Sequence, residues 1–339
     1  MAHYPKLPEE YEDDELSGGR HASLPSKEQR VLRGHEGAVL AVRFNPQGSY
    51  CLSCGKDRTI RLWNPHSGVL VKTYAGHGYE VRDAAVCRDN SKFASVGGDK
   101  PVFLWDVASG NFIRKLRGHD GTINAVRWAA EDQVLLTAGY DQCVKVWDMK
   151  SRSIDPIQVI KGFQDSVTAV LACGHSIVAA SVDGTVRRFD VRTGTALTDR
   201  LHHPVTGLAV TADGLCVLAA CLDSCLRLLD AGSGQQLATY SAPGYLHESV
   251  KMDCCLTPSD AYVVGSSETG EVFYWDLVDS DRVVASFKAH GGVVTSMAMH
   301  PDGQLLLTSS VDGSVKVWGK TGVGAEGGEA EEEEEEEED

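Results

Sequence analysis

A unit of about 42 residues occurs seven times along this chain of 339 residues, and its period limits the fold more than any other feature. Each unit contains a short segment in which an aromatic or aliphatic residue is usually followed by Asp. The segments are RLWN (61–64), FLWD (103–106), KVWD (145–148), RRFD (187–190), RLLD (227–230), FYWD (273–276) and KVWG (316–319). The aromatic or aliphatic positions are spaced by 42, 42, 42, 40, 46 and 43 residues. Such self-similarity indicates repeated supersecondary units that bury their apolar faces against one another.

Within each unit, the residue pattern is that of short strands joined by tight turns. Apolar and polar residues alternate in AVLAVRF (38–44), and turn-forming residues follow in FNPQG (44–48). An apolar strand precedes Gly-His in VKTYAGH (71–77). The period and the segments resemble those of WD-repeat propellers. We therefore expect an all-β, seven-bladed WD-repeat β-propeller over residues 26–319, with four antiparallel strands per blade.

The last repeat lacks a fourth strand after Trp318, because the chain beyond it is rich in Gly and acidic residues. The segment QRVLR (29–33) lies before the first Gly-His pair and has no other strand to pair with. We expect this N-terminal strand to complete the last blade and close the ring, which removes exposed sheet edges.

The acidic residues are concentrated at the two ends of the chain. Of the net charge of −16, −11 lies after Lys320 and −4 in residues 1–25, which leaves −1 for residues 26–320. We expect residues 1–25 to form a disordered acidic arm and residues 320–339 a disordered acidic tail. A nearly neutral body disfavours nucleic acid as the main partner, so direct contact with RNA is at most incidental within a larger complex.

The ten cysteines are unevenly spaced, and the N-terminus does not have the pattern of a signal peptide. We therefore expect free thiols in the nucleus and the cytoplasm, and no membrane-spanning segment. Cys51 and Cys54 form a single CxxC pair on a predicted strand, and a zinc site needs more ligands. The adjacent Cys254 and Cys255 are interpreted as packing residues. We expect no metal, no cofactor and no small-molecule substrate.

Four repeats contain His, Ser or Thr, Asp and Trp at fixed offsets, with 22 residues from His to Asp in each. The sets are His35, Ser53, Asp57, Trp63; His77, Ser95, Asp99, Trp105; His119, Thr137, Asp141, Trp147; and His290, Thr308, Asp312, Trp318. Repeats four, five and six depart from this pattern, and we expect apolar packing alone to hold them.

These sets contain the residue types of a Ser-His-Asp hydrolase, which is one functional hypothesis. A nucleophile needs one cleft and one oxyanion hole, however, whereas this set recurs once per blade with Trp attached. The resemblance to WD-repeat proteins implies instead a buried hydrogen-bonded chain from the Trp indole through Ser or Thr and His to Asp. We therefore expect structural tetrads and no enzymatic activity.

The Gly-His loops and the Asp turns are expected on one face of the ring, where side chains beside them could contact a protein partner. Tyr and Arg in mixed charge surroundings are typical of interface hot spots. The candidate contacts are Lys56, Arg58, Tyr79, Glu80, Arg82, Lys100, Tyr140, Asp165, Tyr245 and His247.

Several segments exceed what a generic propeller requires: GHGYEVRDAA (76–85), GGDKPVFLWDVASG (97–110), SVDGTVRRFDVRTG (181–194), LDSCLRLLDAGSG (222–234), KMDCCL (251–256) and VFYWDLV (272–278). Together they resemble the WD-repeat family of mitogen-activated protein kinase organizers. The resemblance implies a non-catalytic scaffold for spliceosomal factors in pre-mRNA splicing and for kinases of a mitogen-activated cascade. A substrate receptor of a ubiquitin ligase is a further alternative.

Overall fold

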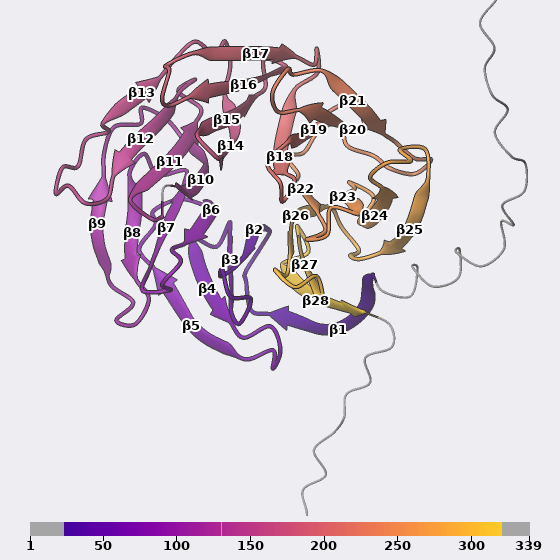
Figure 1. The fold of residues 1–339 in the computed structure, drawn as a ribbon. Coiled ribbons are helices and arrows are strands. Elements are labelled where there is room, and N and C mark those ends of the chain that lie inside the picture. The colour runs from indigo at the N-terminus through magenta and orange to yellow at the C-terminus, as the bar shows by residue number, and fades with distance from the viewer. Residues whose placement is uncertain (1–23, 130, 321–339) are drawn as a thin grey trace, which may run out of the picture.

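The computed structural model describes residues 24–129 and 131–320, and these form 28 β-strands in seven four-stranded sheets. The sheets stand around a common axis, as Figure 1 shows in a view along it. All strand pairs are antiparallel. The described residues contain no helix, and so none that could span a membrane. The all-β, seven-bladed fold expected from the repeat period is confirmed.

Each blade follows the chain from an inner strand near the axis to an outer strand at the rim (Figure 1). Blade 1 comprises β2 (Val39–Phe44), β3 (Cys51–Gly55), β4 (Thr59–Trp63) and β5 (Leu70–Ala75); blade 2 comprises β6 (Val81–Val86), β7 (Lys92–Gly97), β8 (Val102–Asp106) and β9 (Phe112–Leu116); blade 3 comprises β10 (Ile123–Ala129), β11 (Val134–Gly139), β12 (Val144–Asp148) and β13 (Gln158–Ile160); blade 4 comprises β14 (Val167–Cys173), β15 (Ser176–Ser181), β16 (Thr185–Asp190) and β17 (Ala196–Arg200).

The second half of the chain repeats this arrangement. Blade 5 comprises β18 (Val205–Val210), β19 (Cys216–Cys221), β20 (Cys225–Asp230) and β21 (Gln236–Tyr240); blade 6 comprises β22 (Cys254–Leu256), β23 (Tyr262–Ser266), β24 (Glu271–Asp276) and β25 (Val283–Lys288); blade 7 comprises β26 (Val294–Met299), β27 (Leu305–Ser310), β28 (Ser314–Lys320) and β1 (Pro25–Arg33).

Strand β1 closes the ring, as the sequence predicted. It pairs antiparallel with β28, with Leu32 opposite Val315 and Arg30 opposite Val317. The strand is longer than expected, because it begins at Pro25 and not at residue 29, and Leu24 before it is buried against blades 6 and 7. The ordered domain therefore reaches into the end of the segment expected as an arm. The rest of that arm (1–23) and the tail beyond Lys320 lie outside the described residues.

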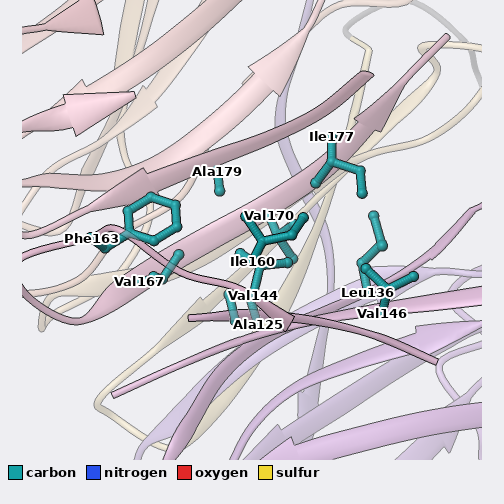
Figure 2. Close-up of a cluster of buried hydrophobic side chains, with 11 residues drawn as sticks. Ala125, Leu136, Val144, Val146, Ile160, Phe163, Val167, Val170, Ile177 and Ala179 are labelled. Atoms are coloured by element: carbon teal, nitrogen blue, oxygen red, sulfur yellow. The ribbon is translucent and has the colours of Figure 1, made fainter. Parts of the chain in front are cut away.

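Seven clusters of buried apolar side chains hold the blades together, one at each blade–blade junction. In the cluster of Figure 2, Leu136 and Val146 of blade 3 meet Val170 and Ile177 of blade 4. At the closing junction, Leu307 of blade 7 packs in the same way with Val42 of blade 1. Since each apolar face is covered only by its neighbour, burial of these side chains favours the complete ring over any part of it.

Candidate functional site

The first tetrad is assembled in blade 1. The Nδ1 atom of His35 lies 2.8 Å from Oδ2 of Asp57, and Nε2 of the same ring lies 2.7 Å from Oγ of Ser53. The indole N–H of Trp63 donates to that Oγ over 2.8 Å. The loop before β2, the strand β3, the turn after it and the strand β4 each supply one of the four groups. The tetrad therefore ties a loop between blades to the strands within one blade.

The other three sets are brought together in the same way, in blades 2, 3 and 7. Their His–carboxylate, His–hydroxyl and indole–hydroxyl distances are 2.7, 2.7 and 2.7 Å for His77, Asp99, Ser95 and Trp105; 2.8, 2.7 and 2.9 Å for His119, Asp141, Thr137 and Trp147; and 3.0, 2.8 and 2.8 Å for His290, Asp312, Thr308 and Trp318.

The donors and acceptors of a tetrad fit only one arrangement of protons. An ionised carboxylate can only accept, so a neutral imidazole carries its proton on Nδ1 and donates it to Asp. Nε2 then accepts the proton of the Ser or Thr hydroxyl, whose oxygen accepts from the indole N–H of Trp. Every polar group of the tetrad then has a partner. This is the condition for burying such a network without a large cost in free energy.

The same bonds occupy the hydroxyl that a hydrolase would use. Ser53, Ser95, Thr137 and Thr308 are each 0% exposed. A substrate carbonyl would have to approach an oxygen that is buried and already accepts a hydrogen bond from indole. Nucleophilic attack needs a reacting atom about 3 Å from the hydroxyl, and these sites leave no room for one. The tetrads are therefore built to hold the blades, and their geometry offers no path to substrate.

Burial controls the protonation of the tetrads. It lowers the pKa of His77, His119 and His290, although the carboxylate beside each ring acts in the opposite direction. Burial alone would raise the pKa of Asp141, but the hydrogen bonds from His119 and Lys145 outweigh it and lower that pKa. The stable combination is a neutral imidazole beside an ionised carboxylate.

The expectation that repeats four to six depend on apolar packing alone is wrong, because polar contacts replace the missing tetrads. In blade 4, the carboxylate of Asp183 accepts the backbone N–H of Gln164 over 2.8 Å, and Arg187 stacks on Phe163. In blade 5, the guanidinium of Arg227 pairs with Asp223. The Asp of the turn after the second strand thus keeps a polar partner in both blades, a loop N–H in blade 4 and a guanidinium in blade 5, although no tetrad His is present.

Blade 6 has a different substitute. The indole N–H of Trp275 donates to the backbone oxygen of Ser241 over 3.2 Å, and the ring of Tyr245 packs edge-on against Trp275 at 5.1 Å between centroids. A side chain at Gly265 would collide with both rings, which explains why no Ser or Thr stands there. The sequence places Thr269 where Asp was expected, and the neighbouring Glu268 accepts three backbone N–H groups from residues 248–250 at 2.6 to 3.0 Å.

Two of the predicted partner contacts, Tyr245 and His247, are buried, so the prediction is wrong for them. Tyr245 is 5% exposed and His247 is 0% exposed. The loop that carries them turns inward, where Nε2 of His247 lies 3.0 Å from Oγ1 of Thr206 and 3.1 Å from the oxygen of Val250. Burial lowers the pKa of His247 to about 4. These side chains fill space in blades 5 and 6, and no partner can reach them.

The other predicted contacts lie on what we call the tetrad face, the face formed by the loops before the inner strands and the turns after the second strands. Tyr79 is 63% exposed and Tyr140 is 68% exposed. Glu80 and Arg82 are half-buried and pair with each other at 3.2 Å. The remaining contacts are exposed: Lys56, Arg58, Lys100 and Asp165. Their role in binding stays a prediction.

A hollow of about 540 Å³ lies on the tetrad face between blades 2 and 3. Two predicted contacts, Tyr79 and Lys100, line it together with Arg117 and His119. Arg117 precedes the third Gly-His pair and is exposed, and it was not among the contacts predicted from the sequence. An exposed aromatic ring and two cationic side chains lining one hollow are a combination found at protein interfaces.

The cysteines pack as small apolar side chains. All ten are free thiols, and Cys51 and Cys54 point into different clusters, at the junctions of blade 1 with blade 7 and with blade 2. Within the described ranges, one group of potential metal ligands comes close together: His119, Asp141 and Cys143. Both ring nitrogens of His119 are already bonded, and the ammonium of Lys145 lies 2.9 Å from Asp141, so this group does not suit a cation.

A cluster of charged side chains, which the repeat pattern did not predict, lies around the axis of the ring. The residues of this axial cluster are Arg43 of β2, Asp83 of β6, Arg127 of β10, and Lys251 and Asp253 just before β22. Arg43 lies 3.0 Å from Asp83 and 2.8 Å from Asp253, and Arg127 pairs with Asp83 as well. The sequence signal for this cluster was a charged residue on each of three inner strands. The alternation of polar and apolar residues alone does not distinguish such a residue from one that faces solvent.

The ring of seven four-stranded sheets and its buried tetrads define the chain as a WD-repeat β-propeller. The family model described as "WD domain, G-beta repeat" matches residues 26–64, 68–106, 110–148, 154–190 and 281–319. The chain therefore belongs to the WD-repeat family. The matched ranges leave out residues 191–280, which contain blade 5 and strands β22–β24 of blade 6. Proteins of this fold are typically non-catalytic and bind other proteins.

Within the family, the chain is similar to proteins called WD repeat domain-containing protein 83. It is 54% identical over 309 residues to the one from Rattus norvegicus and 52% identical to the one from Homo sapiens, with 91% of this chain and 97% of each relative covered. A WD repeat-containing protein of Schizosaccharomyces pombe is 46% identical over 280 residues, which cover 83% of this chain and 94% of the relative. These relatives confirm the resemblance found in the sequence.

Proposed function

We propose that this propeller is a non-catalytic scaffold that acts in the spliceosome during pre-mRNA splicing and also holds kinases of a mitogen-activated cascade. The observation that carries the proposal is the contrast between a buried, fully bonded set of tetrads and an exposed tetrad face with Tyr79, Lys100 and Tyr140. A ring closed by β1 is rigid, and it can present several surfaces at once without rearranging.

Both roles require protein contacts and neither requires chemistry at a bound substrate. The similarity to WD repeat domain-containing protein 83 over nearly the whole length of the relatives supports a shared role for the ring as a whole. The nearly neutral body favours proteins over nucleic acid as direct partners. We further propose that the protein is present in the nucleus and the cytoplasm, since the two roles belong to these two compartments.

Affinity purification of the full chain from separate nuclear and cytoplasmic fractions tests the proposal. We expect splicing factors in the nuclear eluate and kinases of the cascade in the cytoplasmic eluate. Tyr79→Ser combined with Lys100→Glu should reduce recovery of at least one of these sets. The matched control is Val278→Ser, because Val278 is 92% exposed but lies in the turn after β24, on the opposite face. A nuclear eluate without splicing factors would refute the splicing role, and a cytoplasmic eluate without kinases would refute the signalling role.

A further inference from the structure

The axial cluster contains more positive than negative charge. Its three cations are Arg43, Arg127 and Lys251, and its two anions are Asp83 and Asp253. The two carboxylates are already shared by the arginines: Asp83 contacts both of them, and Asp253 contacts Arg43. One positive charge in this cluster therefore has no counterpart among the described side chains.

Lys251 carries this excess charge. Its ammonium reaches across the ring from blade 6 to the backbone oxygen of Asn124 in blade 3, over 3.2 Å, and forms no ion pair with a carboxylate within the described ranges. Burial lowers the pKa of Lys251, and the neighbouring Arg43 and Arg127 act in the same direction, against the carboxylates of Asp253 and Asp83. Nearby thiols add no negative charge, because burial raises the pKa of Cys255 to about 12.

Other charged groups near the axis do not change this balance. Arg82 pairs with Glu80 at 3.2 Å and also donates to the side-chain oxygen of Asn124 over 2.9 Å, so this pair is neutral overall. The hydroxyl of Ser296 donates to Asp253 over 2.6 Å and so strengthens the ionised form of that carboxylate. Each carboxylate is thus committed to partners that it already has.

A hollow of about 330 Å³ opens beside the cluster, on the side of the ring opposite the tetrad face. Arg43, Arg127 and Asp253 line it with the apolar side chains of Leu208, Met297 and Pro301. The side chain of Arg127 lines this hollow and is 27% exposed, so a ligand in the hollow can reach it. Apolar walls around accessible guanidinium groups strengthen an ion pair, because they exclude water from it.

We propose that this axial hollow binds one anionic group, a carboxylate or a phosphate, which contacts Arg127 and Arg43 and balances the charge of Lys251. The ligand would present a single anionic group, because the three cations and two carboxylates of the cluster leave one positive charge to balance. This inference does not depend on the proposed splicing or signalling roles. It assigns to the ring a second binding position, separate from the tetrad face.

The test measures the melting temperature of the full chain at pH 7.5 in sodium phosphate, sodium acetate or octaglutamate, each against sodium chloride of the same ionic strength. Phosphate stabilises many proteins by exclusion from their surfaces, so variants must separate binding from this general effect. Lys251→Met removes the excess charge and touches neither carboxylate, and Arg127→Met removes the exposed contact. Lys100→Met, on the tetrad face, is the matched control.

We expect at least one anion to raise the melting temperature of the wild type and of Lys100→Met by about 2 °C or more at millimolar concentration. The apparent affinity should fall about tenfold or more in Lys251→Met, because the cluster then contains as many anions as cations and no longer favours an added negative charge. A response to phosphate alone would identify a phosphate ligand, and a response to acetate or octaglutamate a carboxylate. Equal responses in Lys251→Met and Lys100→Met, or no response in the wild type, would overturn the proposal. Failure of Arg127→Met to fold would leave the comparison of the two lysine variants intact.

Discussion

The guanidinium of Arg43 in blade 1 donates a hydrogen bond to the carboxylate of Asp253 in blade 6 over 2.8 Å, although the two residues are 210 positions apart in the chain. The same guanidinium contacts Asp83 in blade 2. Ser296 of blade 7 bonds to Asp253 as well, at 2.6 Å. Blades from both ends of the chain are thus joined by charge at the axis, in addition to the apolar junctions between neighbours.

Replacing Arg43 with Met should therefore destabilise the ring. The substitution leaves two carboxylates with fewer partners, and breaking a buried ion pair typically costs about 3–5 kcal/mol. Urea unfolding followed by tryptophan fluorescence measures the change in the free energy of unfolding. Arg192→Met is the control, because Arg192 pairs with Asp190 at the surface, where its side chain is 62% exposed. Equal stability of the two variants would contradict a role for the axial cluster in holding the ring.

Strand β1 should act as the clasp of the ring, because it supplies the outer strand of blade 7 and contributes Leu32 to the closing junction. Leu32 is 2% exposed, so Leu32→Ala should cost about 2–5 kcal/mol and loosen blade 7 before the other blades. Hydrogen exchange should show faster exchange in β28 than in the wild type. The control is Leu197→Ala, at a position 51% exposed on the outer strand of blade 4, and it should change neither the free energy of unfolding nor hydrogen exchange in β28. Equally fast exchange in β28 of this control would contradict a special role of β1 in closing the ring.

Each tetrad should depend on its hydroxyl. Ser95→Ala would leave the indole N–H of Trp105 and Nε2 of His77 without their common partner, at a cost of about 1–3 kcal/mol. Ser95→Thr should keep most of the stability, because Thr137 holds the equivalent position in blade 3 with the same bonds. Thermal unfolding of the two variants gives the comparison. If alanine were as stable as threonine, the network would not contribute to stability.

Much of this architecture could be predicted from the sequence because its determinants repeat. The period predicts seven blades, and the constant distance from His77 to Asp99 or from His119 to Asp141 predicts which side chains meet, since equal offsets place them alike in every blade. The ring closure was also accessible, because residues 29–33 had no other strand to pair with. These features depend on local pattern and on one topological rule.

The features that the sequence did not reveal depend on contacts between distant blades. His247 has the polar character of a surface residue, yet it is buried against Thr206 of the preceding blade. Arg43 has the alternation of a solvated strand position, but its partner Asp253 is 210 residues away in the chain and lies two blades away around the closed ring. The substitute contacts in blade 6 required the position of Tyr245 relative to Trp275, which no repeat pattern specifies. In each case, the contacting residue is brought close only when the blades assemble into the closed ring.

The tetrad serines should not react with serine-directed probes. A fluorophosphonate needs an accessible, activated hydroxyl, whereas Ser53 and Ser95 are 0% exposed and accept indole hydrogen bonds. Incubation of the folded protein with an excess of probe, followed by mass spectrometry of peptides, should show no adduct at either residue. An active serine hydrolase in the same sample controls for the reagent. Stoichiometric labelling of Ser53 or Ser95 would revive the hydrolase hypothesis.

The ring should lose stability in mildly acidic solution because of its buried histidines. Burial lowers the pKa of His247 from 6.5 to about 4, so the unfolded chain binds a proton between these values that the folded chain does not bind. Stability is therefore full above about pH 6.5 and falls as the pH is lowered through this window, by about 3 kcal/mol for His247 alone. The lowered pKa values of His77, His119 and His290 act in the same direction.

Urea unfolding at pH 7.5, 6.0 and 5.0 measures this dependence while the carboxylates remain ionised. His247→Gln keeps a polar side chain of similar reach but cannot take up the proton, so its stability should fall less steeply over the same range, even if it is lower at pH 7.5. His175→Gln is the control, because His175 is exposed in the turn before β15. If the stability of the wild type stayed constant or rose as the pH was lowered from 7.5 to 5.0, the prediction would be wrong. Such a result would mean that the buried imidazoles take up protons in the folded ring at no cost in free energy.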